Sequence, residues 1–197
     1  MIIILVMERQ EINDILLSWI ALSAAFMFLF EGVGIPAVSL MLMYLFIVAV
    51  SFLSHEFGHR QAARKYGFKA NYEMWPTGIL IAVASSLFGF LFAAPGAVVI
   101  RQRGIFTGTR ERLDSIMLRI SIAGIAVNLV LGAVLFIAYF AFGGTSNTLL
   151  MAARINIWLA LFNLIPVPPL DGSKVLRYNK LVWIVAAGIA FTMFLVF

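Results

Sequence analysis

The chain has 197 residues, of which 63% are hydrophobic and only 12% are charged, and its mean hydropathy is +1.03. A soluble domain has about 25% charged residues, so this composition excludes a soluble globular protein and indicates an integral membrane protein. Cysteine is absent, which excludes disulfides and leaves only nitrogen and oxygen ligands for a metal. The net charge of +5 does not indicate nucleic acid binding, because the basic residues lie in short segments between apolar runs.

Six apolar runs of 17 to 27 residues follow one another along the chain. A helix needs about 20 apolar residues to cross the hydrocarbon core of a bilayer. The runs cover residues 14–30, 37–63, 77–100, 120–142, 149–165 and 181–197. The pattern predicts an all-α polytopic membrane protein with about five to six transmembrane helices, folded as a single domain over residues 1–197.

Lys and Arg are unevenly distributed over the connections, and this bias orients the chain. Short cytoplasmic loops concentrate Lys and Arg. The connections at 60–69, 101–119 and 174–180 are basic, whereas 31–36 and 143–148 contain neither residue. We therefore expect a multi-pass protein of the plasma membrane, of prokaryotic type given its compactness, with the basic segments and the N-terminus on the cytoplasmic side.

The run at 77–100 does not fit a single crossing, since the basic connections on its two sides would then lie on opposite faces of the membrane. Its 24 residues are too few for two full crossings. Gly78, Gly89 and Pro95 suit a broken or extended chain. Non-helical backbone at membrane depth is tolerated only against protein or a wet cavity. We expect a re-entrant, partly β hairpin packed beside the run at 37–63, and not a transmembrane helix.

The only two histidines stand in the second run, in the sequence His55-Glu56-Phe57-Gly58-His59. Residues four apart on a helix lie on one face, so both imidazoles can bind one zinc ion, with the carboxylate of Glu56 beside its open position. An ionisable cluster in a membrane segment is costly unless it faces the interior and has a function. The motif predicts one zinc ion per chain, recessed by roughly 15 Å from the cytoplasmic end of this helix.

A catalytic zinc site uses three protein ligands and a water, so the two histidines leave one ligand to be found. Asp171 is the strongest candidate carboxylate. Three prolines within residues 166–169 stop the preceding apolar helix, and Gly172 lets the backbone turn so that the carboxylate points back into the bundle. Taken alone, Asp171 can equally be a loop carboxylate paired with Lys174.

The two motifs together resemble the site-2 protease family of intramembrane zinc metalloproteases, peptidase family M50. HExxH in a membrane helix is followed about 100 residues later by NxxPxPxLDG, and both are complete in this sequence. Between them, Gly124 and Asn128 are similar to the small-xxx-Asn element of the family's middle core helix. The resemblance covers residues 37–176 and implies a three-helix catalytic core. The matching positions are His55, Glu56 and His59, and Asn163, Pro166, Pro168, Leu170, Asp171 and Gly172.

The resemblance implies zinc on His55, His59 and Asp171, with Glu56 as general base and proton shuttle. Water on the zinc, activated by Glu56, would attack the scissile carbonyl, and the amide of Asn163 would steady the oxyanion. The implied reaction is hydrolysis of peptide bonds within transmembrane helices of membrane-anchored substrates, near the cytoplasmic side (regulated intramembrane proteolysis). An edge strand of the expected hairpin can hold such a substrate in extended form by strand addition.

Other interpretations stay open at this stage. A noncatalytic family member could bind membrane helices without cutting them, although an intact Glu56 disfavours this. A zinc transporter would be expected to present a ladder of ligands, whereas one cluster is visible. Asn163 can serve as an interhelical hydrogen-bonding residue, and packing is the favoured interpretation of Gly124 and Asn128. The expected partners are a transmembrane protein substrate and the lipid bilayer, and no nucleic acid.

Overall fold

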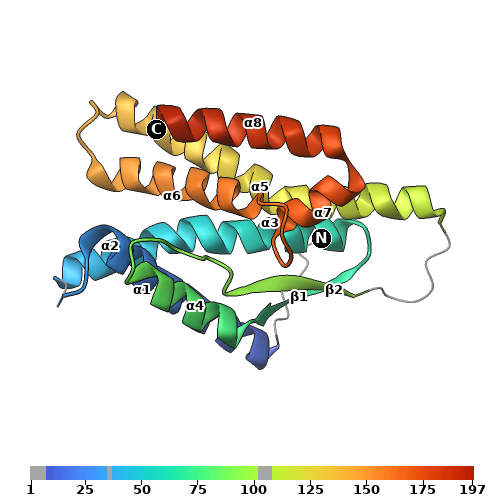
Figure 1. Ribbon diagram of the computed structural model, residues 1–197, viewed down its shortest axis with the longest axis horizontal. Helices are drawn as coiled ribbons and strands as arrows, with labels where there is room; N and C mark the ends of the chain where they lie inside the picture. Colours follow the sequence, from blue (N-terminus) through green and yellow to red (C-terminus); the bar gives the residue numbers. More distant parts are fainter. Residues whose placement is uncertain (1–7, 35–36, 102–107) are drawn as a thin grey trace, which may run out of the picture.

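The computed structural model describes residues 8–34, 37–101 and 108–197. Within them the chain is mostly helical, with one short two-stranded sheet (Figure 1). The elements in chain order are α1 (Arg9–Glu31), α2 (Val38–Val48), η1 (Ala49–Leu53), α3 (Ser54–Lys65), β1 (Lys69–Met74), α4 (Pro76–Ser86), β2 (Gly96–Arg101), α5 (Arg110–Ala141), α6 (Asn147–Asn163), α7 (Asp171–Tyr178) and α8 (Lys180–Val196).

Three helices of the described residues are long and apolar enough to cross a membrane. They are α1, the continuous helix α2–η1–α3 (Val38–Lys65) and α5. The helices α6 and α8 have 17 residues each, which is at the short end for a crossing. The expectation of a mostly helical membrane protein is therefore confirmed, while the total of five to six crossings stays a prediction.

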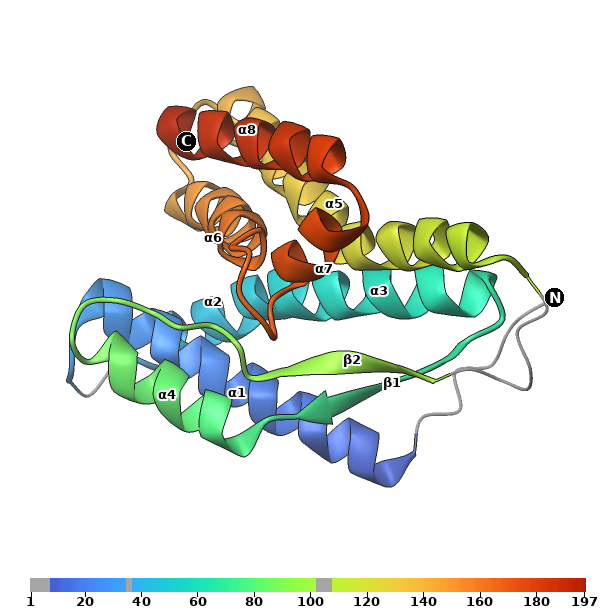
Figure 2. The ribbon, with the colours of Figure 1, turned by 45° about the vertical axis from the view of Figure 1, so that its right-hand side comes forward.

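The long helix α2–η1–α3 runs through the middle of the molecule (Figure 2). On one side of it lie α5, α6, α7 and α8, and on the other lie α1, α4 and the two strands. One apolar core joins α1, α2 and α6 around Phe26, Tyr44 and Ile155. A second joins α5 and α6 to α7 and α8 around Ile125 and Val175. A third joins Ala63 of α3 to Ile120 of α5 and Ala70 of β1, so the middle helix is packed on both sides and its histidine-bearing part lies inside the protein.

Within the long helix, the residues of η1 form a single π-helical turn. The hydroxyl of Ser51 donates to the carbonyl of Ile47 at 2.8 Å and accepts from the Asn156 amide at 3.0 Å. Single π turns inside α-helices are often found at functional sites. Here the turn ends directly before Ser54, where α3 begins.

The segment 77–100 differs in part from the expected hairpin. Its end is extended, because β2 pairs antiparallel with β1, with Met74 opposite Gly96. Its first half, however, is the helix α4, which begins at Pro76, where the fixed φ of proline suits a first helical position. The second strand comes from 69–74, part of which we had assigned to a basic connection. Alternating burial of Ala70 and Tyr72 explains this strand. The re-entrant position of the segment in the membrane stays a prediction.

Side chains of α1 cover the outer edge of β1. A carboxylate oxygen of Glu11 accepts the Tyr72 N–H at 3.0 Å, and one of Asp14 accepts the Met74 N–H at 3.2 Å. The Tyr72 hydroxyl donates to Ser18 at 2.9 Å. This edge of the sheet is therefore satisfied by the neighbouring helix, and no further strand in the described residues pairs with β2 on its other edge.

Candidate metal centre and active site

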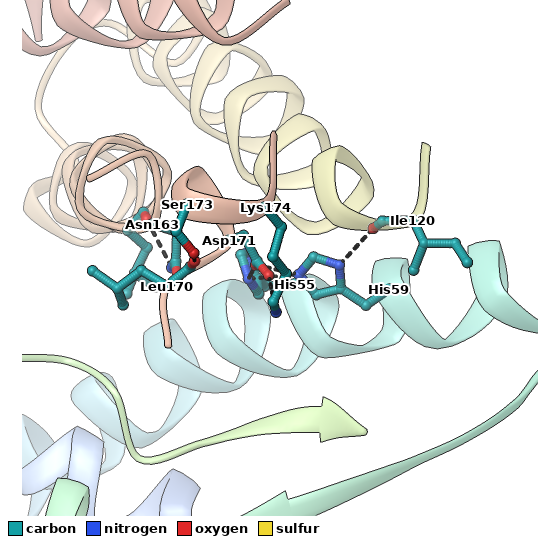
Figure 3. A network of polar contacts seen from close by, with 9 residues as sticks. His55, His59, Ile120, Asn163, Leu170, Asp171, Ser173 and Lys174 are labelled. Carbon is teal, nitrogen blue, oxygen red and sulfur yellow. Dashed lines mark hydrogen bonds and ion pairs between the residues drawn. The ribbon is translucent and has the colours of Figure 1, made fainter. Parts of the chain in front are cut away.

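The candidate site lies between α3 and α7. The first turn of α3 carries His55 and Glu56, and His59 follows one turn later. Asp171 is the first residue of α7, directly after the proline-rich connection from α6. Figure 3 shows the two imidazoles and the Asp171 carboxylate converging in the space between these helices. The structure therefore brings together the three residues that were predicted as ligands, although His55 and Asp171 are 116 positions apart in the sequence.

The spacing of the three donor atoms fits one zinc ion. The Nε2 atoms of His55 and His59 are 3.0 Å apart. An oxygen of Asp171, Oδ2, lies 2.7 Å from His59 Nε2 and 3.3 Å from His55 Nε2. Three ligands at about 2.0–2.1 Å from a tetrahedral zinc are about 3.3 Å from one another. Two nitrogens and one carboxylate oxygen are also a donor set that catalytic zinc accepts, so the residues present fit this metal.

Two further contacts orient the candidate ligands. The Nδ1–H of His59 donates to the Ile120 carbonyl of α5 at 2.8 Å (Figure 3), which leaves Nε2 free for a metal. The ammonium of Lys174 donates to Asp171 Oδ1 at 2.9 Å, so the other carboxylate oxygen faces the histidines. Asp171 thus pairs with Lys174 through one oxygen and lies against both histidines through the other, so the ion pair leaves the position of a metal ligand open. Such secondary hydrogen bonds fix the tautomer and orientation of metal ligands.

Two glycines permit the close approach of backbone to the site. A Cβ atom on Gly124 of α5 would lie 2.3 Å from His59 Nε2 and 2.8 Å from His55 Nε2. A Cβ atom on Gly172 would lie 2.2 Å from the carbonyl oxygen of Leu164. Any larger residue at these positions would displace a candidate ligand or the connection before Asp171. Gly124, for which packing had been favoured, therefore lies directly against the metal-facing nitrogens.

A cavity of about 50 Å³ adjoins the histidines and Asp171. A water molecule needs a cavity of roughly 10–15 Å³ or more, so this cavity has room for water. Its wall includes Glu56, Asn163 and the residues of β2 from Gly96 to Val98, together with Ile100. The candidate site therefore has room for water next to an extended strand.

The two residues predicted to act directly in catalysis both line this cavity. Oε2 of Glu56 is buried and has no hydrogen-bond partner within the described part of the chain, so it is available to take up a proton. Asn163 lies on the cavity wall at the end of α6, but its amide donates to the carbonyl of Leu159 at 3.0 Å. To reach an oxyanion, the Asn163 amide would have to leave that carbonyl, and its role stays a prediction.

One buried ion pair next to the site was not foreseen. Arg60, the residue after His59, donates to both carboxylate oxygens of Glu11 at 2.7 and 3.2 Å. The two side chains are 6% and 3% exposed, respectively. The pair ties α1 to the histidine-bearing helix and, through the Tyr72 N–H, to β1.

Burial also raises the pKa of the Tyr72 phenol above its usual value, so its hydroxyl stays a donor. The one signal in the sequence for these contacts of α1 was the spacing of Glu11, Asp14 and Ser18, which puts three polar side chains on one face of an otherwise apolar helix.

Comparison with known proteins supports the assignment of these motifs. The model of peptidase family M50 matches residues 138–192. A protein of Methanocaldococcus jannaschii with the provisional name zinc metalloprotease is 32% identical over 182 residues, which are 89% of this chain and 88% of that protein. A second protein of the same archaeon, named zinc metalloprotease, is 31% identical over 156 residues, 77% of this chain and 39% of its own length.

A bacterial relative adds to these. A Bacillus subtilis protein, also provisionally named zinc metalloprotease, is 32% identical over 163 residues, 71% of this chain and 69% of its own. No solved structure matches the chain. Because the identity to the first archaeal protein extends over nearly all of both chains, and the family model matches the segment that carries Asn163 and Asp171, the chain belongs to peptidase family M50, the site-2 protease family of zinc metalloproteases.

Proposed function

We propose that this membrane metalloprotease uses one zinc ion to hydrolyse peptide bonds within transmembrane helices of membrane-anchored proteins. One observation carries the proposal: His55, His59 and Asp171 converge beside Glu56, whose buried Oε2 has no hydrogen-bond partner among the described residues. This cluster lies on a helix that is apolar enough to cross a membrane. A soluble substrate would not require a peptidase to place its reactive groups in such a helix, where ionisable residues are costly.

The proposed chemistry divides between the metal and the side chains. Zinc in this position would polarise the scissile carbonyl and lower the pKa of a bound water to about 7. Glu56 takes a proton from the attacking water and delivers it to the leaving amine nitrogen, as a general base and then a general acid. Ile120 and Lys174 hold His59 and Asp171 in their orientations. Asn163, after rotating its amide toward the cavity, donates to the developing oxyanion.

The outer edge of β2, which pairs with no strand of the described residues, supports a route for presenting the substrate. In the antiparallel ladder Tyr72 of β1 is opposite Val98 of β2, and Ala70 is opposite Ile100. The backbone N–H of Tyr72 points away from β2 and donates to Glu11. By the same alternation, the N–H and C=O groups of Val98 and Ile100 point away from β1. Both residues line the cavity. A locally unwound substrate can therefore pair with this edge, which exposes its carbonyls to the site.

The orientation in the membrane is proposed from charge. Arg64 and Lys65 are at the end of α3, about one to two turns after His59. Arg110 and Arg112 open α5 close to the same end of the molecule (Figure 1). Because Lys and Arg concentrate in short cytoplasmic segments, we place the site toward the cytoplasmic side of a plasma membrane.

The test is cleavage of a model single-span protein by the purified full-length protein in liposomes. Wild type should give product, and 1,10-phenanthroline should abolish it. The control variant Glu8→Gln should behave in the same way, because the Glu8 side chain is exposed and pairs only with Lys69 in the described structure. Glu56→Gln should bind zinc and give no product. Equal product from Glu56→Gln and wild type would refute the proposed role of Glu56 and assign the activity to a contaminant.

A transporter interpretation makes a different prediction. Zinc flux into the same vesicles that is abolished by His59→Ala but retained by Glu56→Gln would favour transport over proteolysis. We expect no such flux, since the described residues contain one group of three candidate ligands and no series of groups along a path.

A further inference from the structure

The two candidate histidine ligands differ in the partner of their second ring nitrogen. His59 donates its Nδ1–H to the Ile120 carbonyl at 2.8 Å. His55 also directs Nε2 to the metal side, but its Nδ1 is buried and has no partner among the residues that the structure describes. A histidine ligand nearly always donates this second N–H to a carboxylate, a carbonyl or a water. His55 is therefore missing the contact that its counterpart has.

A second unsatisfied group lies on the neighbouring helix. Asn128 of α5 is fully buried, and neither its Oδ1 nor its Nδ2 has a hydrogen-bond partner in the described residues. A buried amide without partners is rare in native proteins, and a buried water usually satisfies such a group. Packing between helices does not explain why the residue is an amide and not an apolar side chain of the same size.

The packing of α5 against α3 places these two groups at the same level. Along α5, the Ile120 carbonyl bonds to His59. One turn later, a Cβ on Gly124 would lie 2.8 Å from both Cε1 and Nε2 of the His55 ring. Asn128 follows one further turn on the same face, about 6 Å along the axis in the direction that leads from His59 to His55. Asn128 therefore lies one turn beyond the residue of α5 that packs against the His55 ring, and within the described residues both the His55 Nδ1 and the Asn128 amide are without a partner.

We propose that Asn128 is the positioning residue for His55. Its side-chain oxygen accepts the Nδ1–H of the imidazole through one buried water, and so holds His55 in the tautomer that presents Nε2 to the metal. The inference rests on the proposed function, in which His55 is a zinc ligand. It assigns the same task to Asn128 that the Ile120 carbonyl performs for His59.

The alternative is that Asn128 only fills space, and the two roles predict opposite results for Asn128→Leu, which keeps the branching and the number of heavy atoms of Asn. If Asn128 only packs, removing an unpaired buried amide should leave zinc affinity unchanged and raise the melting temperature. If it positions His55, zinc affinity should fall by about 10- to 100-fold, the usual effect of losing such a partner. Asn128→Asp keeps an acceptor and should retain wild-type affinity to within about tenfold.

The experiment measures zinc affinity by chelator competition, and the absorption spectrum of the cobalt(II)-loaded protein, on full-length protein in detergent. The matched control is Ile125→Val, a change in the buried core on the same helix, which should lower thermal stability and leave the affinity and the cobalt spectrum unchanged. Asn128→Val replaces Asn128→Leu if the larger side chain prevents folding.

Each outcome decides the matter. A loss of affinity and a changed cobalt spectrum in Asn128→Leu, with recovery in Asn128→Asp, supports the positioning role. Wild-type affinity in Asn128→Leu overturns it while leaving the proposed metal site intact. His55→Ala separates the two levels, because wild-type zinc affinity in that variant would overturn the metal site itself and the inference with it.

Discussion

Gly124→Ala should abolish most of the activity although it adds a single methyl group. The added Cβ would lie 2.3 Å from His59 Nε2 and 2.8 Å from His55 Nε2. Ordinary contact begins at 3.4 Å, so the imidazole of His59 would have to move by about 1 Å. His59 cannot make this shift freely, because its Nδ1 is bonded to the Ile120 carbonyl of the same helix as Gly124.

The magnitude follows from the displacement. Misplacing a reacting group by about 1 Å costs roughly a hundredfold in rate, and moving two of three ligands should weaken zinc binding as well. We therefore expect at least about a hundredfold lower cleavage, together with a measurable loss of zinc affinity.

The assay is cleavage of a single-span substrate in liposomes with zinc affinity measured on the same preparation. The control is Gly188→Ala in α8, where nothing lies within 4 Å of an added Cβ. Alanine is a better helix former than glycine, so this variant should keep its stability, zinc affinity and activity. Wild-type zinc affinity and cleavage in Gly124→Ala would refute the placement of both histidines against α5.

Three further predictions concern groups around the site. Glu11→Gln leaves Arg60 as a buried charge without its carboxylate and should destabilise the protein by about 3–5 kcal/mol, measured by thermal unfolding. The control Glu8→Gln removes an exposed ion pair and should cost less than about 1 kcal/mol. Equal losses of stability in the two variants would contradict the importance of burial. Val98→Pro removes an N–H that points away from β1 and should lower cleavage while zinc affinity is retained; unchanged cleavage in a folded variant would exclude strand addition at β2. Lys174→Met removes the partner of Asp171 Oδ1 and should weaken zinc binding by about tenfold, and unchanged affinity would mean that the ion pair does not orient the ligand.

The sequence predicted the parts of the fold that depend on long apolar runs and on short motifs. The first, second and fourth runs correspond to α1, α2–η1–α3 and α5, because a long apolar stretch has few other stable arrangements in a membrane. The two motifs also identified His55, His59 and Asp171, which the structure brings within 3.3 Å of one another. Spacing within one helix and a proline stop before a carboxylate are local features that a sequence displays directly.

The parts that could not be predicted depend on contacts between distant segments. Strand β1 is short and contains Lys69 and Glu73, so its pairing with β2 is visible only once the sheet is formed. The α4 helix was missed because Gly78, which reads as a breaker, allows the Ala94 carbonyl to approach the helix. The partner of His59 is a backbone carbonyl, which every residue has and which therefore leaves no trace in the sequence.

The π-helical turn Ala49–Leu53 has a consequence for how the family can diverge. An ordinary helix that gains or loses one residue turns everything beyond that point by about 100°, which would swing the catalytic face of α3 toward lipid. A π turn accommodates one additional residue in a single wide turn, so the faces before and after it keep their relative direction when that residue is deleted. Deleting one residue within 49–53 of this chain should therefore leave the histidines facing the site, whereas a deletion in the α-helical turns on either side should not.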